Sequence, residues 1–308
     1  MAQKVKADKR HWRKIDGVLL LNKATGISSN GALQSARRLF LSAKAGHSGT
    51  LDPLASGLLP LCFGEATKFS TDLLNADKAY EADVRFGITT TTGDAEGKVV
   101  HRCPVDFNQA ELEAALCSFR GEIEQIPPMY SALKYGGQPL YRLARQGIDV
   151  ERAVRRVTIH ELDLLTFSDG SCRLRIVCSK GTYIRTLAED IGKMMKCGAH
   201  LAALRRTRTG SFGIDQAFTL SVLEAMSDEE RLASLFPIDA LLQGLLRIDL
   251  AEHDIARFIH GNPVRPARDS LPPGSYRVYG KGYFLGVAKI IHPGELRPSR
   301  LVVFPASG

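Results

Sequence analysis

The chain has 308 residues and carries 41 Lys and Arg against 33 Asp and Glu, which gives a formal net charge of +8. This length predicts one large domain and one small one, and the excess of positive charge favours a polyanionic partner such as RNA. No window is apolar enough to span a membrane. The sequence contains neither a Walker A loop nor a G-x-G-x-x-G followed by an acidic ribose ligand, so we expect no nucleotide cofactor. The six cysteines form no C-x-x-C pair, so we expect reduced core thiols in a cytoplasmic protein, with no disulfide framework and no metal.

The N-terminal end is basic, and we expect residues 1–14 to form a disordered tail that adds loose phosphate contacts. The apolar run Gly17–Lys23 (GVLLLNK) then predicts a strand. Ser28 and Ser29 open a helical pattern rich in Ala, Leu and Arg.

Residues 46–57, GHSGTLDPLASG, place a single carboxylate, Asp52, between glycines and a proline. This segment, here called the aspartate loop, has too few apolar residues at helical or strand period to pack as a core element. The composition predicts a rigid surface loop that holds an aspartate in a fixed place, although an isolated Asp-Pro pair more often marks an ordinary turn. Further along, strict alternation predicts a strand with one apolar face, formed by Tyr80, Ala82, Val84, Phe86 and Ile88.

The aspartate loop and the elements around it resemble the catalytic core of the bacterial tRNA pseudouridine synthases of the TruB family. The signature of that family is G-H-x-G-x-L-D-P-x-A-x-G, and residues 46–57 match every fixed position. The resemblance implies isomerisation of uridine to pseudouridine at position 55 in the T-loop of tRNA, with Asp52 as the nucleophile on a flipped-out base. This reaction breaks the N1–C1′ bond, turns the base and rejoins it through C5, so it needs a carboxylate but no cofactor. Whether Asp52 attacks C6, attacks C1′ or drives elimination is left open.

Later segments predict further elements of the same fold. Asn108 and Glu111 form a capping-box pattern for a helix that ends near residue 120. Residues 125–155, rich in Pro, Gly and Tyr, suit an excursion from the sheet, and the resemblance identifies them as an inserted thumb that closes over the RNA. Residues 155–179 predict two strands joined by a Ser-Asp-Gly turn, and a helix starts at about residue 181.

Strands and helices that follow one another without βαβ alternation predict an α+β fold with a mixed or antiparallel central sheet. We place the catalytic domain at residues 15–245. Between residues 246 and 308, short strands punctuated by Gly and Pro predict a small β-rich module. It resembles the PUA-type RNA-binding domain that bacterial members of the family carry, and a structural appendage is the alternative.

The resemblance also assigns roles around Asp52. Arg185 matches the arginine that pairs with the catalytic aspartate and keeps it ionised, although a helix-surface ion pair with Glu189 would explain it equally well. Tyr80 matches the tyrosine that stacks on the flipped base, and an ordinary strand tyrosine with its hydroxyl at the surface is the alternative. The other assignments are substrate contacts by His47, Tyr183 and Leu204, loop support by Lys23, and RNA backbone contacts by Arg205, Arg206 and Arg208. One departure from the family is Ala24, which stands where a proline usually follows Lys23.

Two hypotheses from other classes compete with the synthase. A non-catalytic RNA-binding protein or tRNA-folding chaperone would keep its effect when Asp52 is replaced. A nucleoside or N-glycoside hydrolase would also use a carboxylate at C1′, but such enzymes need a second carboxylate or a metal to activate water. The sequence shows no acid-rich cluster to supply either one. We therefore expect a monomeric enzyme that binds the T-arm of tRNA.

Overall fold

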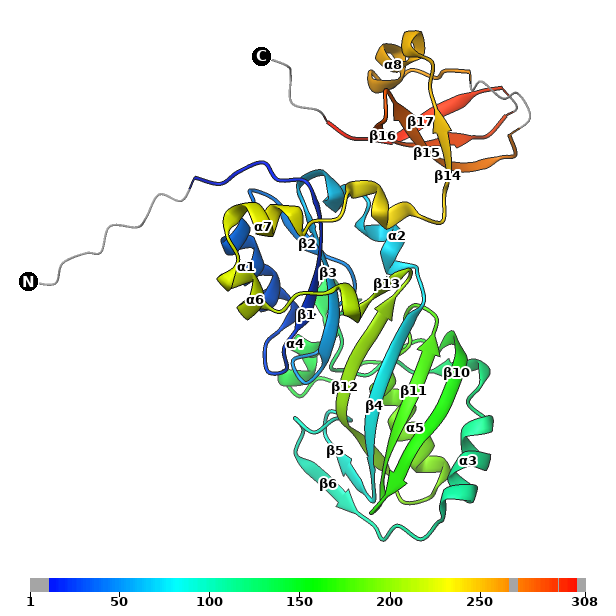
Figure 1. Ribbon diagram of the computed structural model, residues 1–308. Coiled ribbons are helices and arrows are strands. Elements are labelled where there is room, and N and C mark those ends of the chain that lie inside the picture. Colours follow the sequence, from blue (N-terminus) through cyan, green and yellow to red (C-terminus); the bar gives the residue numbers. More distant parts are fainter. Residues whose placement is uncertain (1–10, 266–270, 293, 304–308) are drawn as a thin grey trace, which may run out of the picture.

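The computed structural model describes residues 11–265, 271–292 and 294–303. Within these ranges the larger part of the chain is built on one nine-stranded sheet (Figure 1). Its strands are β1 (Gly17–Lys23), β2 (Ala45–His47), β3 (Ser56–Phe63), β4 (Lys78–Phe86), β7 (Gly121–Gln125), β10 (Arg155–Ser168), β11 (Ser171–Cys178), β12 (Ala199–Thr209) and β13 (Phe212–Gly213).

The main strand order is β1-β3-β12-β4-β11-β10-β7, with β2 paired to β3 and β13 paired to β12. The pairing of β3 with β12 is parallel, whereas β12 pairs antiparallel with β4 and β1 pairs antiparallel with β3. The expected mixed central sheet is therefore confirmed. The single parallel step brings the end of the aspartate loop against the arginine-rich part of β12, because Ser56 and Gly57 pair with Arg205 and Arg206.

Helices cover the sheet in two groups (Figure 1). One group lies beside β1 and the other lies behind β4, β11 and β10. The first group is α1 (Ser29–Phe40), α6 (Leu220–Ala225) and α7 (Asp228–Ala233), the second is α3 (Gln109–Cys117) and α5 (Ile184–Met194), and α2 (Ser70–Leu74) follows the 3-10 helix Gly64–Lys68. Two further 3-10 helices span Ile214–Gln216 and Ile238–Leu242.

Two of the predicted helix starts are confirmed by their caps, whereas the helix expected from about residue 181 begins at Ile184 without a side-chain cap. The Ser28 hydroxyl accepts from Gly31 N at 3.0 Å, so α1 begins one residue later, at Ser29. Asn108 and Glu111 form a complete capping box at the start of α3.

The core lies on both faces of the first strands. Leu19 and Leu21 of β1 pack into the main cluster with Phe40 and Phe63, whereas Val18 and Leu20 point into a second cluster on the other face. A strand buried on both faces needs a continuous apolar run and not an alternating one. This explains the sequence GVLLLNK, and it makes β1 and β3 a rigid base for the aspartate loop.

Two excursions leave the sheet close to the aspartate loop. The first is the hairpin of β5 (Ile88–Thr90) and β6 (Val99–Arg102). The second, between β7 and β10, contains β8 (Lys134–Tyr135), β9 (Gln138–Pro139) and α4 (Leu140–Arg145). It occupies the segment that we interpreted as the thumb.

A separate four-stranded sheet forms the C-terminal part of the chain, in the order β14-β15-β16-β17 (Figure 1). Its elements are β14 (Leu246–Asp249), α8 (Glu252–Ile259), β15 (Gly274–Gly280), β16 (Tyr283–Ile290) and β17 (Leu296–Leu301). The rings of Phe69 and Phe284 are 5.5 Å apart, and the Tyr279 hydroxyl donates to Asp239 at 2.5 Å. The small β-rich domain is thus packed against the large one through apolar and polar contacts.

The prediction of a disordered tail over residues 1–14 is wrong for its last part. Arg13 N donates to Leu41 O at 2.6 Å, Ala43 N donates to Arg13 O at 2.9 Å, and the Arg13 guanidinium pairs with Asp228 at 2.6 Å. These bonds attach residue 13 to the loop after α1 and to α7. Residues 1–10 lie outside the described part of the chain.

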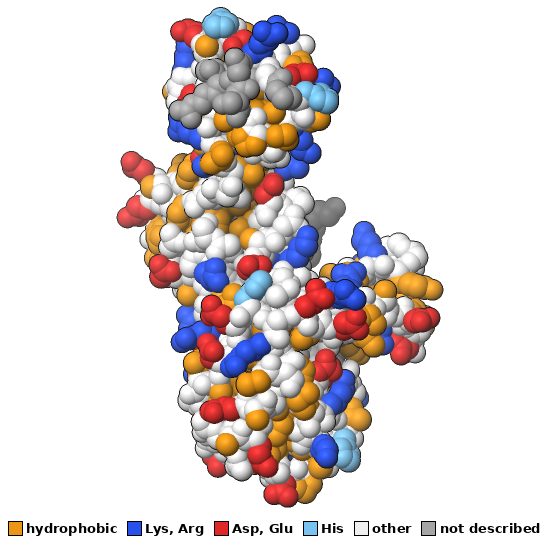
Figure 2. Space-filling view, turned by 90° about the vertical axis from the view of Figure 1, so that its right-hand side faces the viewer, with side chains coloured by type: hydrophobic (Ala, Val, Ile, Leu, Met, Phe, Trp, Pro, Cys, Tyr) orange, Lys and Arg blue, Asp and Glu red, His pale blue; other side chains and the backbone are white. Residues whose placement is uncertain are grey.

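Charges of both signs are interspersed over the face shown in Figure 2, and no extended area of it carries one sign alone. An RNA-binding surface therefore has to be located from individual residues around the site. Among the described residues, no helix has the length and apolarity needed to cross a membrane.

Candidate active site

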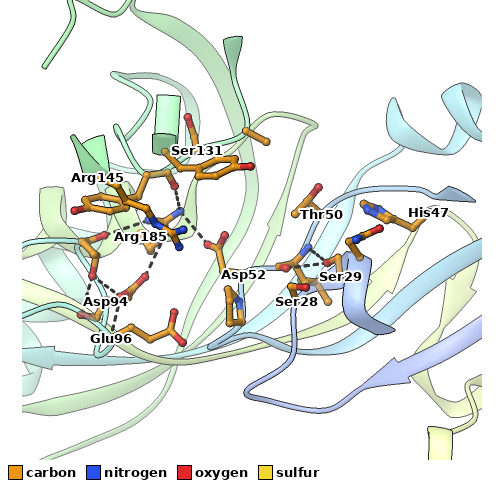
Figure 3. A pocket seen from close by; sticks show the side chains of 17 residues that line it. Ser28, Ser29, His47, Thr50, Asp52, Asp94, Glu96, Ser131, Arg145 and Arg185 are labelled. Carbon is orange, nitrogen blue, oxygen red and sulfur yellow. Dashed lines mark hydrogen bonds and ion pairs between the residues drawn. The ribbon is translucent and has the colours of Figure 1, made fainter. Parts of the chain in front are cut away.

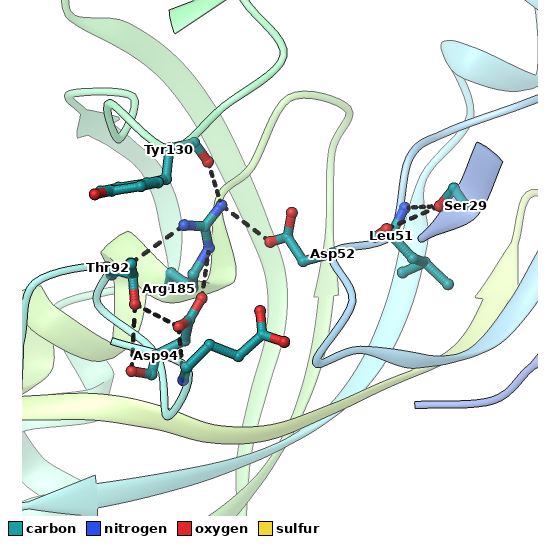
Figure 4. Close-up of polar contacts among 8 residues, drawn as sticks. Ser29, Leu51, Asp52, Thr92, Asp94, Tyr130 and Arg185 are labelled. Atoms are coloured by element: carbon teal, nitrogen blue, oxygen red, sulfur yellow. Dashed lines mark hydrogen bonds and ion pairs between the residues drawn. The ribbon is translucent and has the colours of Figure 1, made fainter. Parts of the chain in front are cut away.

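The aspartate loop is held on both sides of Asp52 by hydrogen bonds to its backbone. The Ser29 hydroxyl accepts from Leu51 N at 2.7 Å and donates to Leu51 O at 2.8 Å (Figure 4). On the other side, Gly26 N donates to Pro53 O at 2.8 Å. Because the residues before and after Asp52 are both fixed, the carboxylate projects from a rigid backbone, as the composition of the loop predicted.

Arg206 supports the base of the same loop. Its guanidinium donates to Leu58 O at 2.7 Å and to Gly49 O at 2.9 Å, and the side chain is buried. Gly57 has φ +102°, and a Cβ there would lie 2.3 Å from Arg206 O, so only glycine permits this approach of β3 to β12.

This burial corrects the expected role of Arg206 as an RNA backbone contact, whereas Arg205 and Arg208 are exposed. A register shift in β12 between Arg206 and Arg208 turns Arg208 outward, which the alternation of a regular strand would not do.

Arg185, in the first turn of α5, lies between two carboxylates (Figures 3 and 4). It approaches Asp52 to 2.9 Å and Asp94 to 3.6 Å, and its side chain is 6% exposed. It also donates to Thr92 O at 3.2 Å and to Tyr130 O at 2.7 Å. The alternative of a surface ion pair with Glu189 therefore does not apply.

Burial raises the pKa of Asp52 above its ordinary value of 3.8, and nearby Asp94 raises it further. Arg185 and Lys23 act in the opposite direction and favour the ionised form. Lys23 is buried and donates to Ala24 O at 2.9 Å and to Ile27 O at 2.8 Å, and burial lowers the pKa of its ammonium to about 8. The backbone carbonyl of Ala24 thus accepts a hydrogen bond from Lys23, although alanine replaces the proline that is usual after this lysine in the family.

The sequence shows no acid-rich cluster that would supply a second carboxylate, but the fold brings two acids close to Asp52. Asp94 and Glu96, from the β5–β6 hairpin, line a cavity together with Asp52. Asp94 is buried and accepts from the Thr92 hydroxyl and from Glu96 N, so its carboxylate is already occupied. Glu96 is exposed, and its pKa is raised by desolvation and by both aspartates.

A cavity of about 350 Å³, here called the base cavity, brings most of the predicted site residues together. Its lining includes Asp52, Tyr80, Tyr183, Arg185 and Leu204. Tyr80 is 9% exposed, and burial raises the pKa of its phenol although Arg206 opposes this. Its hydroxyl is therefore not a surface group, in contrast to the ordinary-strand alternative.

A second cavity, of about 490 Å³, opens on the other side of Asp52 and Arg185 (Figure 3). His47 lines one end of it, beyond Thr50, whereas Arg145 of the thumb lies at the opposite end, beside Arg185. Burial and the charge of Arg206 lower the pKa of His47, which favours a neutral imidazole at pH 7.

Sequence reasoning missed the residues that position the site. Besides Ser29, the buried amide of Gln125 at the end of β7 fixes Tyr183, since it accepts from Tyr183 N at 3.0 Å and donates to Tyr183 O at 3.3 Å. Each of these side chains makes a reciprocal pair of bonds to the backbone of a residue within two positions of a charged site residue, Asp52 or Arg185. A serine or glutamine in such a place has no distinctive spacing in the sequence. Among the described residues, no group of three or more His, Cys or acidic side chains is arranged to hold a metal ion.

Three known protein families match consecutive parts of this chain. The family described as "TruB family pseudouridylate synthase (N terminal domain)" matches residues 37–184. Two C-terminal families, "tRNA pseudouridylate synthase B C-terminal domain" and "Pseudouridine synthase II TruB, C-terminal", match residues 185–244 and 247–302.

Curated relatives and solved structures extend the likeness over nearly the whole chain. A protein of Dechloromonas aromatica (strain RCB) named tRNA pseudouridine synthase B is 55% identical over 297 residues, which cover 96% of this chain and 98% of the relative. A protein of the same name from Ralstonia nicotianae is 56% identical, with 96% of each chain covered. The crystal structure of a Cbf5-Nop10-Gar1 complex matches with a TM-score of 0.70 and 23% identity, over 94% of this chain and 84% of the other, which shows a common fold. The chain therefore belongs to the TruB family of pseudouridylate synthases.

Proposed function

We propose that this protein isomerises uridine to pseudouridine at position 55 in the T-loop of tRNA, with Asp52 as the nucleophile on a flipped-out base. The names of its relatives support a tRNA substrate. The observation that carries the proposal is the base cavity, in which one carboxylate paired with a buried arginine faces aromatic and aliphatic walls. Such a cavity suits a single extruded nucleotide.

The chemistry needs an ionised carboxylate in a place that excludes bulk water. Burial raises the pKa of Asp52 and so favours its protonated form, and Arg185 opposes this through a 2.9 Å ion pair. Attack at C6, attack at C1′ and elimination all use this ionised form. The base must also be retained while it is detached and turned, and we assign this to stacking on Tyr80 and to the wall formed by Tyr183 and Leu204.

The RNA backbone is held outside the base cavity. We assign phosphate contacts to the exposed Arg205 and Arg208, and to Arg145 of the thumb at residues 125–155. Residues 15–245 form the catalytic domain in this proposal, and the PUA-like module at 246–308 adds contacts to the tRNA. The enzyme acts on the T-arm as a monomer, without a nucleotide cofactor.

The test is site-resolved detection of pseudouridine in an unmodified tRNA transcript, by carbodiimide-blocked primer extension or by tritium release from C5. The wild type should modify the T-loop uridine, and Asp52→Asn should reduce the rate by about 10⁴-fold or more while binding the transcript equally well. If both proteins bind the RNA and neither modifies it, the chaperone hypothesis replaces the synthase.

Hydrolysis of the N-glycosidic bond deserves a separate measurement because Glu96 provides a second carboxylate in the neighbouring cavity. The pKa of the Glu96 carboxyl is raised, which suits a group that exchanges protons with water. Free uracil in the reaction mixture would support hydrolysis. We expect none, because a synthase must keep the base until it is rejoined.

A further inference from the structure

Ser131, in the thumb, has a buried hydroxyl with no hydrogen bond of good geometry among the described residues, although it lies near the Tyr183 phenol. Its side chain is 6% exposed, and it lines both cavities that meet at Asp52. A buried hydroxyl without a partner costs free energy, and such groups are uncommon in folded proteins. A hydroxyl at the junction of two cavities is in a position to donate to a partner that comes from outside the chain.

The backbone around Ser131 is fixed on both sides, so the hydroxyl is held in place. Arg185 donates to the carbonyl of Tyr130 at 2.7 Å. Tyr141 N donates to Ser131 O at 3.1 Å, and Leu140 N donates to Leu133 O at 2.7 Å. The main chain before the Ser131 side chain is thus tied to Arg185 through Tyr130, and the main chain after it is tied to α4.

The polar groups of the base cavity show what such a hydroxyl could add. The other polar side chains that line it include one acid, Asp52, and the cations Lys78, Arg185 and Arg206. Lys78 and Arg206 are committed to backbone carbonyls, since Lys78 donates to Leu74 O at 2.7 Å. Uracil presents two carbonyl acceptors on either side of its N3–H. A serine hydroxyl can donate to such a carbonyl without adding a charge to the cavity.

We propose that Ser131 is a substrate-positioning residue that donates a hydrogen bond to a carbonyl of the flipped uracil, an inference that rests on the proposed function. A half turn about the N3–C6 axis exchanges C5 with N1 and O4 with O2. The carbonyl beside the glycosidic bond is therefore O2 before the turn and O4 after it. One fixed donor can serve the base in both orientations, which suits an enzyme that must retain the base while it turns.

Tyr183 offers a competing role for Ser131. The pKa of the Tyr183 phenol is raised by burial and lowered in part by Ser131, which indicates that the two hydroxyls are near each other. If Ser131 acted only by orienting Tyr183, then Ser131→Ala would have no further effect in a Tyr183→Phe background. If it contacts the base, the two losses should multiply.

The experiment measures single-turnover pseudouridine formation, tRNA affinity and thermal stability for Ser131→Ala. We expect a rate about tenfold lower, from the loss of one hydrogen bond, with the Kd for tRNA within about twofold because phosphate contacts dominate affinity. The melting temperature should be unchanged or higher, because an unpaired buried hydroxyl has been removed. Thr209→Val is the matched control, since the Thr209 hydroxyl is also buried and unpaired among the described residues but lines neither cavity.

Three outcomes would overturn the inference: a Ser131→Ala rate within twofold of the wild type, an equal loss in Thr209→Val, or no further loss when Ser131→Ala is added to Tyr183→Phe. A lower melting temperature together with a rate that recovers on cooling would also overturn it, because that pattern indicates a structural role. An inactive wild type in the same assay would refute the proposed function, and the inference with it. An active wild type with an equally active Ser131→Ala would refute the inference alone.

Discussion

Two buried arginines hold the aspartate loop, one at its tip and one at its base, and they bind different kinds of group. At the base, Arg206 donates to the main-chain carbonyls of Gly49 and Leu58. At the tip, Arg185 pairs with the carboxylates of Asp52 and Asp94 and donates to carbonyls of two other segments.

The difference separates geometry from charge. Bonds from Arg206 to backbone carbonyls fix the path of the chain and are the same whatever the protonation state of Asp52. The ion pair of Arg185 changes the energy of that protonation state directly. The same residue type is therefore expected to support folding in one place and chemistry in the other.

Of the two arginines, Arg185 should give the larger loss of rate when it is replaced by Met. Without the cation, burial and Asp94 both raise the pKa of Asp52 further, so less of the carboxylate is ionised at neutral pH. We expect the single-turnover rate at pH 7 to fall by about 10²–10³-fold and to recover in part as the pH rises. Rate–pH profiles of the variant and the wild type check this.

Arg185→Lys is the matched control for that variant. It keeps the positive charge but cannot donate to all four partners, so it should lose less activity than Arg185→Met and should show a smaller shift of the pH profile. If both variants lost stability alone, with unchanged rates per folded molecule, the contrast between the two arginines would disappear.

Arg206→Met should lower the stability of the protein more than its rate, the opposite of what we expect for Arg185→Met. It leaves the buried carbonyls of Gly49 and Leu58 without a donor, so we expect the free energy of unfolding to fall by about 2–4 kcal/mol. The rate per folded molecule should fall by roughly tenfold or less, because Asp52 and Arg185 are unchanged. Urea unfolding measures the free energy of unfolding, and assays at a temperature where the variant stays folded measure the rate per folded molecule. A large loss of rate with normal stability would contradict our assignment.

The tip of the loop was predictable from the sequence and the base was not. Residues 46–57 carry a long motif, and the resemblance supplied the pairing of Asp52 with Arg185. Arg206 was expected at the surface because it stands in a basic cluster, and the register shift of β12 that turns Arg208 outward while Arg206 is buried has no signal in the sequence. Strand alternation and helix caps were predictable because they depend on local periodicity.

Contacts that depend on distant segments were missed for a related reason. Asp94 and Glu96 lie more than forty residues beyond Asp52 in the chain, and only the return of the β5–β6 hairpin brings them to the same cavity. Likewise, Arg13 stands in a basic stretch that predicts disorder, yet it pairs with Asp228 on α7. Composition describes a segment alone, whereas these contacts depend on how the sheet folds the chain back.

The smallest effect that the comparison predicts is a gain in stability for Asp52→Asn. The pKa of Asp52 is raised in the folded protein, so the folded state binds its proton more tightly than the unfolded state, and the free energy of unfolding falls as the pH rises through this range. At pH 7 the ionised carboxylate therefore destabilises the fold slightly, since its side chain is 40% exposed and is partly screened by solvent. Asparagine removes that cost and can still accept from Arg185. Urea unfolding should find Asp52→Asn slightly more stable than the wild type at pH 7, and the difference should shrink toward pH 4. A less stable variant at pH 7 would mean that the attraction of Asp52 to Arg185 outweighs the cost of its burial. The tip of the loop would then support folding as the base does.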